Sequence, residues 1–203
     1  MKNYKKIYNI VVVGVGNIGS RHFQSLAKLD LNFNLFAIDN NKNSIKLAKK
    51  RFNSQAIKGK INSIIYLDNI NKISINIDLL IVATNSNIRR PIIEKIFKKN
   101  KISNIVLEKI CFQSDKDFQK IINITKIHHT RTWVNLAKRY LPLYKFLKEN
   151  TKNDKKIYIE ISAGISEIGS NTIHALDILS FLSNSMIKSI DMSLIENKIY
   201  KSK

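Results

Sequence analysis

Residues 7–19 read IYNIVVVGVGNIG and decide how the chain begins. The run from Ile7 to Val13 is short and apolar, which is typical of a strand buried on both faces of a sheet. Three glycines follow in the spacing GxGxxG, and from Ile18 to Leu29 apolar residues recur at helical intervals. The stretch therefore predicts a buried strand, a tight glycine loop and a helix, in that order.

The glycine loop has the spacing of a dinucleotide-binding turn. Gly14 would allow the tight turn, Gly16 would let the backbone approach a pyrophosphate, and Gly19 would let the helix pack against the strand. The amides of Asn17 and Ile18 open the helix, where phosphates bind well. The alternative is that the glycines only close a turn, and the strand and helix on either side favour the binding site.

An acidic residue supports the same interpretation. Asp39 lies 20 positions after Gly19, at the end of the alternating stretch from Leu31 to Ile38. A carboxylate there accepts hydrogen bonds from the adenosine ribose. It also repels a 2′-phosphate, so we expect NAD as the cofactor, with NADP left open.

Strand and helix patterns alternate through the first half of the chain. Further strands are expected at 64–67, 79–83 and 105–107, and helices at 43–52, 89–99 and 115–127. In the second helix Pro91 would stand in the first turn, and Ser114 resembles the start of a capping box for the third. This alternation predicts an α/β fold: a doubly wound, Rossmann-type parallel sheet over residues 1–128. Its carboxyl edge would gather Gly14, Asp39, Thr84 and Lys109.

The second part, residues 129–203, has a different pattern. We expect strands at 130–134, 156–163 and 187–194, and helices at 138–148 and 171–182. This order predicts a partial α+β domain with an open sheet, in the place of a substrate or dimerisation domain. An open sheet exposes an unpaired edge, so a homo-oligomer is expected only if this domain is complete enough.

Charge and composition exclude several functions. The net charge is +20, but only six of the 35 basic residues are arginine and the lysines are scattered, which argues against a nucleic-acid partner. No apolar run is long enough to span a membrane and no signal peptide is evident, so a cytoplasmic protein is expected. The single cysteine, Cys111, is expected to be a packed small residue, and His128 and His129 lack further ligands at metal-binding spacing.

Four stretches in order resemble the Gfo/Idh/MocA family of oxidoreductases. They are VVVGVGNIGSRH (11–22), IVATN (81–85), VLEK (106–109) and IHALD (173–177). A fifth, TWVN (132–135), with Arg139 and Tyr144, resembles a branch linked to surface-polysaccharide genes. The resemblance implies reversible hydride transfer between NAD(P) and a sugar or nucleotide-sugar type of alcohol or ketone. It also implies that Thr84, Asn85 and Glu108 lie at the cofactor.

The resemblance further implies three catalytic residues. Oxidising an alcohol requires a base for the hydroxyl proton, and Lys109 stands at a strand end where it could take it. His174 would relay the proton, with Asp177 beside it one helical turn away. The alternatives are a surface lysine, a packed helix histidine and a solvated carboxylate. Without the resemblance these would be preferred for His174 and Asp177.

Other polar residues have two interpretations each. Arg89, Arg90 and Arg139 could meet an anionic substrate, or, for the first two, could simply be surface charge. His22 is expected to be structural or to lie near the pyrophosphate.

Two departures from the family pattern matter. Ile110 replaces the proline that usually follows Glu-Lys, so a trans peptide is expected there. The second domain is also shorter than in the family. The sequence thus leaves a second hypothesis open, a truncated and catalytically incomplete nucleotide-binding protein.

Overall fold

A computed structural model describes residues 6–57, 60–154, 156–161 and 168–195 of the 203-residue chain. The chain divides into two compact units, Met1–Asn135 and Leu136–Lys203. The division falls later than the expected one between residues 128 and 129. The reason is that strand β8 (Arg131–Val134) pairs in parallel with β7 (Asn104–Leu107) and so belongs to the first sheet.

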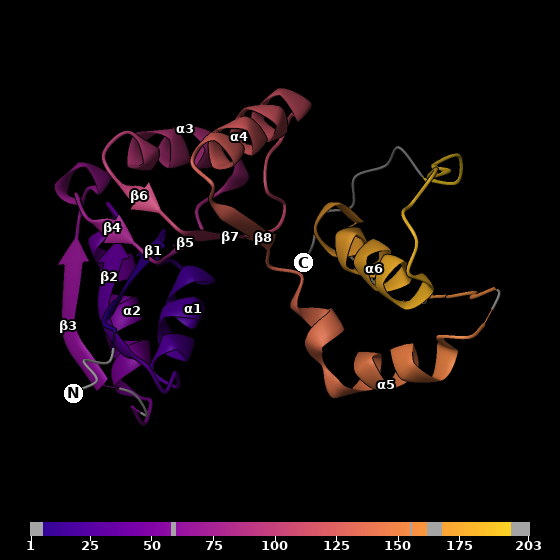
Figure 1. Cartoon of the computed structure of the whole chain (residues 1–203), viewed down its shortest axis with the longest axis horizontal. Coiled ribbons are helices and arrows are strands. Elements are labelled where there is room, and N and C mark those ends of the chain that lie inside the picture. The colour runs from indigo at the N-terminus through magenta and orange to yellow at the C-terminus, as the bar shows by residue number, and fades with distance from the viewer. Residues whose placement is uncertain (1–5, 58–59, 155, 162–167, 196–203) are drawn as a thin grey trace. The chain divides into compact units, whose positions relative to one another are not determined.

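The first unit is built on a six-stranded sheet with the order β3-β2-β1-β5-β7-β8 (Figure 1). All neighbouring strands are parallel. The remaining strands are β1 (Tyr8–Val13), β2 (Asn32–Ile38), β3 (Lys60–Leu67) and β5 (Leu79–Val82). In register, Val13 is opposite both Ile38 and Val82, and Val82 is opposite Leu107. Four strands therefore end in line, and the loops after them meet at one edge.

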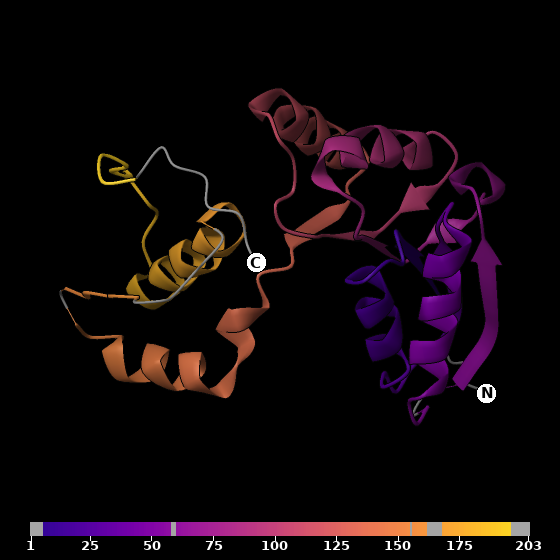
Figure 2. The ribbon, with the colours of Figure 1, turned by 180° about the vertical axis from the view of Figure 1, so that it is seen from behind.

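Helices cover both faces of this sheet. Helices α1 (Gly19–Leu26) and α2 (Lys42–Asn53) lie on one face, and α3 (Ser86–Phe97) and α4 (Asp115–Ile127) on the other, as Figures 1 and 2 show from opposite sides. Alternate strand residues point to each side, so there are two apolar layers. Val12 packs with Phe23 and Phe52, and Val11 packs with Ile93 and Ile121. The predicted doubly wound α/β sheet is confirmed.

Some details of the first unit differ from expectation. Helix α3 begins at Ser86, three residues before the expected start at Arg89, so Pro91 lies inside the helix and not in its first turn. The 3-10 turn η1 (Ile70–Lys72) and a small parallel sheet of β4 (Asn76–Ile77) and β6 (Lys101–Ile102) were not expected. Such two-residue strands are too short to leave a periodic pattern.

The described part of the second unit is helical. It contains the 3-10 turn η2 (Ala137–Tyr140), α5 (Pro142–Thr151) and α6 (Ile168–Ser183). The single helix expected over 138–148 is divided, because Pro142 takes the first position of α5, where its missing N–H costs nothing. Every described helix is too short or too polar to cross a lipid bilayer.

The strands expected in the second unit do not form in its described residues. Residues 156–161 and 187–194 are extended or irregular and pair with no strand, whereas 162 and 163 lie outside the described residues. Tyr158 is 87% exposed and Leu194 is 95% exposed. An alternating pattern becomes a stable strand only beside a hydrogen-bonding partner strand, and the described residues offer none. The expected open sheet is therefore wrong for this part of the chain.

Candidate functional site

Gly14 and Gly19 make the turn between β1 and α1 possible. Gly14 has φ of 80°, and a Cβ added there would stand 2.8 Å from the Thr84 amide nitrogen. A Cβ on Gly19 would stand 1.7 Å from the carbonyl oxygen of Gly14. Any side chain would force these backbones apart, so the turn and the close helix contact require glycine, as predicted.

Gly16 differs from the other two glycines. A Cβ on Gly16 would meet only the Ser44 hydroxyl oxygen, at 3.9 Å. The fold itself does not need a glycine here. The open space beside Gly16 is what a ligand approaching the backbone closely would require.

Asp39 is fixed beside the glycine loop. Its Oδ2 accepts a hydrogen bond of 2.9 Å from the Val15 amide, and its Oδ1 accepts one of 2.8 Å from the Asn41 amide. The Asn41 side chain in turn caps α2 by accepting from the Asn43 amide. The carboxylate is thus held rigidly at the end of β2, with lone pairs left for a ligand.

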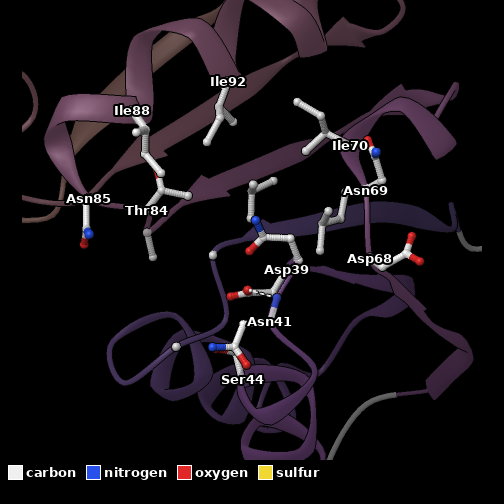
Figure 3. Close-up of a pocket in the computed structure, with 16 residues that line it drawn as sticks. Asp39, Asn41, Ser44, Asp68, Asn69, Ile70, Thr84, Asn85, Ile88 and Ile92 are labelled. Atoms are coloured by element: carbon white, nitrogen blue, oxygen red, sulfur yellow. Dashed lines mark hydrogen bonds between the residues drawn. The ribbon is translucent and has the colours of Figure 1, made fainter.

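A cavity of about 490 Å³ lies over this edge of the sheet (Figure 3). Five predicted site residues line it: Gly14, Gly16, Asp39, Thr84 and Asn85. Figure 3 shows Asp39, Asn41 and Ser44 on one side, and Thr84, Asn85, Ile88 and Ile92 across from them. The sheet edge therefore brings together the residues that the sequence placed at strand ends.

The third strand also contributes to the cavity. Asp68, Asn69 and Ile70 follow β3 and line the cavity, yet none was predicted. The signal was available, because ligands of parallel sheets bind beyond the carboxyl ends of the strands and β3 was expected to end at Leu67.

The cavity fits a dinucleotide in its polar groups. The Thr84 hydroxyl is buried and has no hydrogen-bond partner in the described part of the chain. Buried hydroxyls are nearly always hydrogen-bonded, so this one is an exception among the described residues. The open face of Gly16 and the fixed Asp39 carboxylate suit a pyrophosphate and a ribose, respectively.

Asn17, Ile18 and Gly19 complete the loop without lining the cavity. Asn17 and Ile18 are exposed, and Gly19 is buried against Gly14. The Asn17 carbonyl accepts a 2.7 Å hydrogen bond from Arg51 Nη1. Arg51 is on α2 and was not predicted, because nothing local marks a helix residue that reaches back to a distant loop.

Glu108 is buried and is not among the residues that line the cavity. Its Oε1 lies 2.6 Å from His22 Nε2 and accepts a 2.5 Å hydrogen bond from Asn135 Nδ2. Burial opposes ionisation, but the hydrogen bonds from His22 and Asn135 outweigh it and hold the pKa of Glu108 below its ordinary value. The sequence predicts Glu108 at the cofactor. In the structure its side chain, directly after β7, links His22 of α1 with Asn135, the residue after β8. His22 has a structural contact.

Arg89 is buried, contrary to both interpretations of the sequence. It is 2% exposed, and its guanidinium donates to the carbonyls of Thr84, Glu108, Ile110 and Cys111. Burial lowers its pKa. The next residue, Arg90, is half-buried and pairs with Glu94 and Asp117.

Lys109 follows β7 and is half-buried. The peptide bond between Lys109 and Ile110 is cis, so the expectation of a trans bond without proline was wrong. Cys111 is buried, as expected for a packed residue.

The other two predicted catalytic residues lie in the second unit. The Asp177 carboxylate is buried and forms an ion pair with Arg139. His174, half-buried on the same helix, lines a cavity of about 780 Å³ with Tyr144 and Ile178 among others. Arg139 and Asp177 both belong to the second unit, so this ion pair lies within that unit.

Comparison with known protein families identifies the family of the first unit. The model of the oxidoreductase family with an NAD-binding Rossmann fold, Gfo/Idh/MocA, matches residues 8–136, more than half of the chain. The chain belongs to the Gfo/Idh/MocA family. The match covers the sheet, its helices and the whole cavity, and it implies a nicotinamide cofactor. A comparison with curated proteins finds no match.

Solved structures of Gfo/Idh/MocA type share the fold at low identity. Myo-inositol 2-dehydrogenase from Lactobacillus plantarum has a TM-score of 0.66 at 17% identity, over 88% of this chain and 57% of its own. Apo scyllo-inositol dehydrogenase from Lactobacillus casei has a TM-score of 0.65 at 14% identity, and the match covers 89% of this chain and 56% of that one. The WlbA dehydrogenase from Bordetella pertussis, solved with NADH and UDP-GlcNAcA, has a TM-score of 0.65 at 16% identity. The match covers 88% of this chain and 60% of that one. The chain thus spans little more than half of their length.

Proposed function

We propose that the chain binds NAD in the cavity at the carboxyl edge of its sheet. The observation that carries this is the fixed position of Asp39, whose carboxylate is anchored to the Val15 amide of the glycine loop. The loop amides and the start of α1 would hold the pyrophosphate, and Asp39 would accept the adenosine ribose hydroxyls. The negative charge at Asp39 disfavours a 2′-phosphate, so NAD is favoured over NADP.

The reaction we propose is hydride transfer to or from a sugar or nucleotide-sugar type of alcohol or ketone. Family membership supports the reaction class, and the WlbA structure with UDP-GlcNAcA suggests the substrate class, consistent with surface-polysaccharide synthesis. The nicotinamide would supply or accept the hydride. Lys109 would take or return the hydroxyl proton, and His174 would relay it, with Asp177 beside it.

A second candidate function is nucleotide binding without turnover. It is favoured by the second unit, whose described residues form helices and no strand. Both functions need the same cavity and differ only in what the second unit contributes.

Titration with NADH, followed by turnover on a panel of polyols, sugars and nucleotide sugars, tests both functions. Lys109→Ala should bind NADH as the wild type does and lose at least about 100-fold in rate, as expected for removal of a general acid–base. Binding without turnover on any substrate would select the second candidate. An unchanged rate in Lys109→Ala would remove Lys109 from its role.

A further inference from the structure

Arg89 is a buried cation that the proposed chemistry does not use. It sits in the first turns of α3 and is 2% exposed. Its Nη1 donates to the carbonyl of Glu108 and, at 2.7 and 2.9 Å, to those of Ile110 and Cys111. Its Nη2 donates to the carbonyl of Thr84. All four acceptors are backbone oxygens, and no carboxylate of the described residues is bonded to this charge.

These carbonyls belong to two separate loops. Thr84 is in the loop after β5, and Glu108 to Cys111 form the loop after β7. The two strands are neighbours in the sheet. A guanidinium has a rigid planar fork of donors, and hydrogen bonds from a charged donor are strong. A single side chain therefore bridges the two loops and fixes their spacing.

The order of the strands shows which part of a dinucleotide these loops meet. The glycine loop follows β1, and Asp39 follows β2 on one side of it. The loops after β5 and β7 lie on the opposite side of β1. A dinucleotide with its pyrophosphate at the glycine loop and its adenosine at Asp39 therefore extends its nicotinamide end over β5 and β7.

We propose that Arg89 is a positioning residue for the nicotinamide end of the site. By holding the backbone of Thr84 and of Glu108 to Cys111 together, it sets where the Thr84 hydroxyl and the Lys109 side chain stand relative to each other. It touches no ligand itself. The proposal rests on the proposed function, because it needs a dinucleotide in the cavity.

Two ligands separate this role from a general effect on the fold. ADP-ribose has the adenosine and pyrophosphate of NADH but lacks the nicotinamide. Their dissociation constants would be measured by calorimetry on the full chain as wild type, Arg89→Met and Arg90→Met. Arg90 is the matched control, because it is the next residue of α3 and pairs with Glu94 and Asp117 away from both loops.

In Arg89→Met, NADH affinity should fall about 10-fold or more while ADP-ribose affinity changes less than about twofold, since lost charge-assisted hydrogen bonds act only at one end of the site. Arg90→Met should leave the ratio of the two affinities unchanged. Arg89→Lys keeps the charge but lacks the planar fork of donors. Its ratio of NADH affinity to ADP-ribose affinity should therefore lie between the ratios of the wild type and Arg89→Met. Methylguanidinium should restore part of the NADH affinity to Arg89→Ala and should leave the NADH affinity of Arg90→Met unchanged.

The outcomes are distinct. An equal loss for both ligands in Arg89→Met and Arg89→Lys, without rescue by methylguanidinium, would overturn the inference and make Arg89 purely structural. Unchanged NADH affinity in both variants would overturn it as well. If Arg89→Met does not fold, the ratio in Arg89→Lys and the rescue of Arg89→Ala decide the matter. Failure of the wild type to bind either ligand would instead overturn the proposed function, and the inference with it.

Discussion

In the proposed function, Asp39 would select the cofactor through two properties of its carboxylate, its charge and its fixed position. Its two oxygens are held by the amides of Val15 and Asn41, so the charge cannot move away from a ligand. In Asp39→Asn the charge is lost and one acceptor oxygen becomes a donor. The ratio of NADPH to NADH affinity should rise about 10-fold, because a full charge next to the ribose no longer repels a 2′-phosphate.

Fluorescence titration with both reduced cofactors measures that ratio. Asp30→Asn is the matched control, since Asp30 is an exposed carboxylate that does not line the cavity. An unchanged preference in Asp39→Asn would show that the carboxylate does not face the ribose.

Glu108 makes stability depend on pH. Hydrogen bonds from His22 and Asn135 outweigh the effect of burial, so its folded-state pKa is lower than its unfolded-state pKa. The stabilisation is therefore complete above the ordinary carboxyl range and is lost as the pH falls through the lowered pKa. In Glu108→Gln, which cannot ionise, the free energy of unfolding should fall less steeply over that acid range.

Urea unfolding at a series of pH values, followed by the fluorescence of Trp133, measures this effect. Trp133 is the only tryptophan and lies in β8 of the same sheet. Equal slopes of unfolding free energy against pH for the wild type and Glu108→Gln would mean that ionisation of Glu108 does not contribute to stability.

The residues of the site differ in how far the sequence reveals them. Gly14, Gly19 and Asp39 could be predicted because a tight turn and a strand end leave a local pattern. The His22–Glu108 pair joins residues 86 positions apart, and Arg89 bonds to carbonyls up to 22 positions away. No local pattern carries such contacts, because backbone carbonyls are present at every residue. The sequence therefore offers only two interpretations of Arg89, a contact with an anionic substrate or a surface charge.

At the scale of elements, the β1–α1 unit depends on the close contact of Gly19 with Gly14. In Gly19→Ala the new Cβ would stand 1.7 Å from the Gly14 carbonyl oxygen, so helix and strand must separate. We expect a loss of at least about 2 kcal/mol in the free energy of unfolding, the scale of an overpacked core. Urea unfolding followed by Trp133 fluorescence measures it.

Gly169→Ala is the control for this variant. Gly169 lies in α6 of the other unit, and a Cβ there has no atom within 4 Å. Its Trp133 transition should match that of the wild type. A wild-type transition in Gly19→Ala as well would contradict the close contact.

The elements themselves were predictable where burial leaves a strong pattern. The apolar run before Gly14 and the helical spacing after it gave β1 and α1 close to their observed bounds. The second unit was not predictable in the same way. Alternation at 156–163 indicates which residues would share one face of a strand, but strand pairing depends on a partner that the pattern cannot specify.

At the scale of the whole molecule, the two units hold different residues of the proposed site. The first unit holds the complete cavity, from the glycine loop to Asp39 and Thr84, together with Lys109. The second holds His174 and Asp177. We therefore expect cofactor binding to need only the first unit, and turnover to need the second unit as well.

Gly16 provides the most direct test of cofactor binding. In the fold a Cβ at Gly16 meets only one atom, at 3.9 Å, so Gly16→Ala should keep the melting temperature of the wild type. The same methyl group would fill the space through which the pyrophosphate approaches the backbone. Calorimetric titration of the full chain with NADH should give saturable binding to the wild type and at least about 10-fold weaker binding to Gly16→Ala, because a buried clash costs more than about 1.4 kcal/mol. Equal binding to both proteins, or no binding to the wild type, would contradict the account.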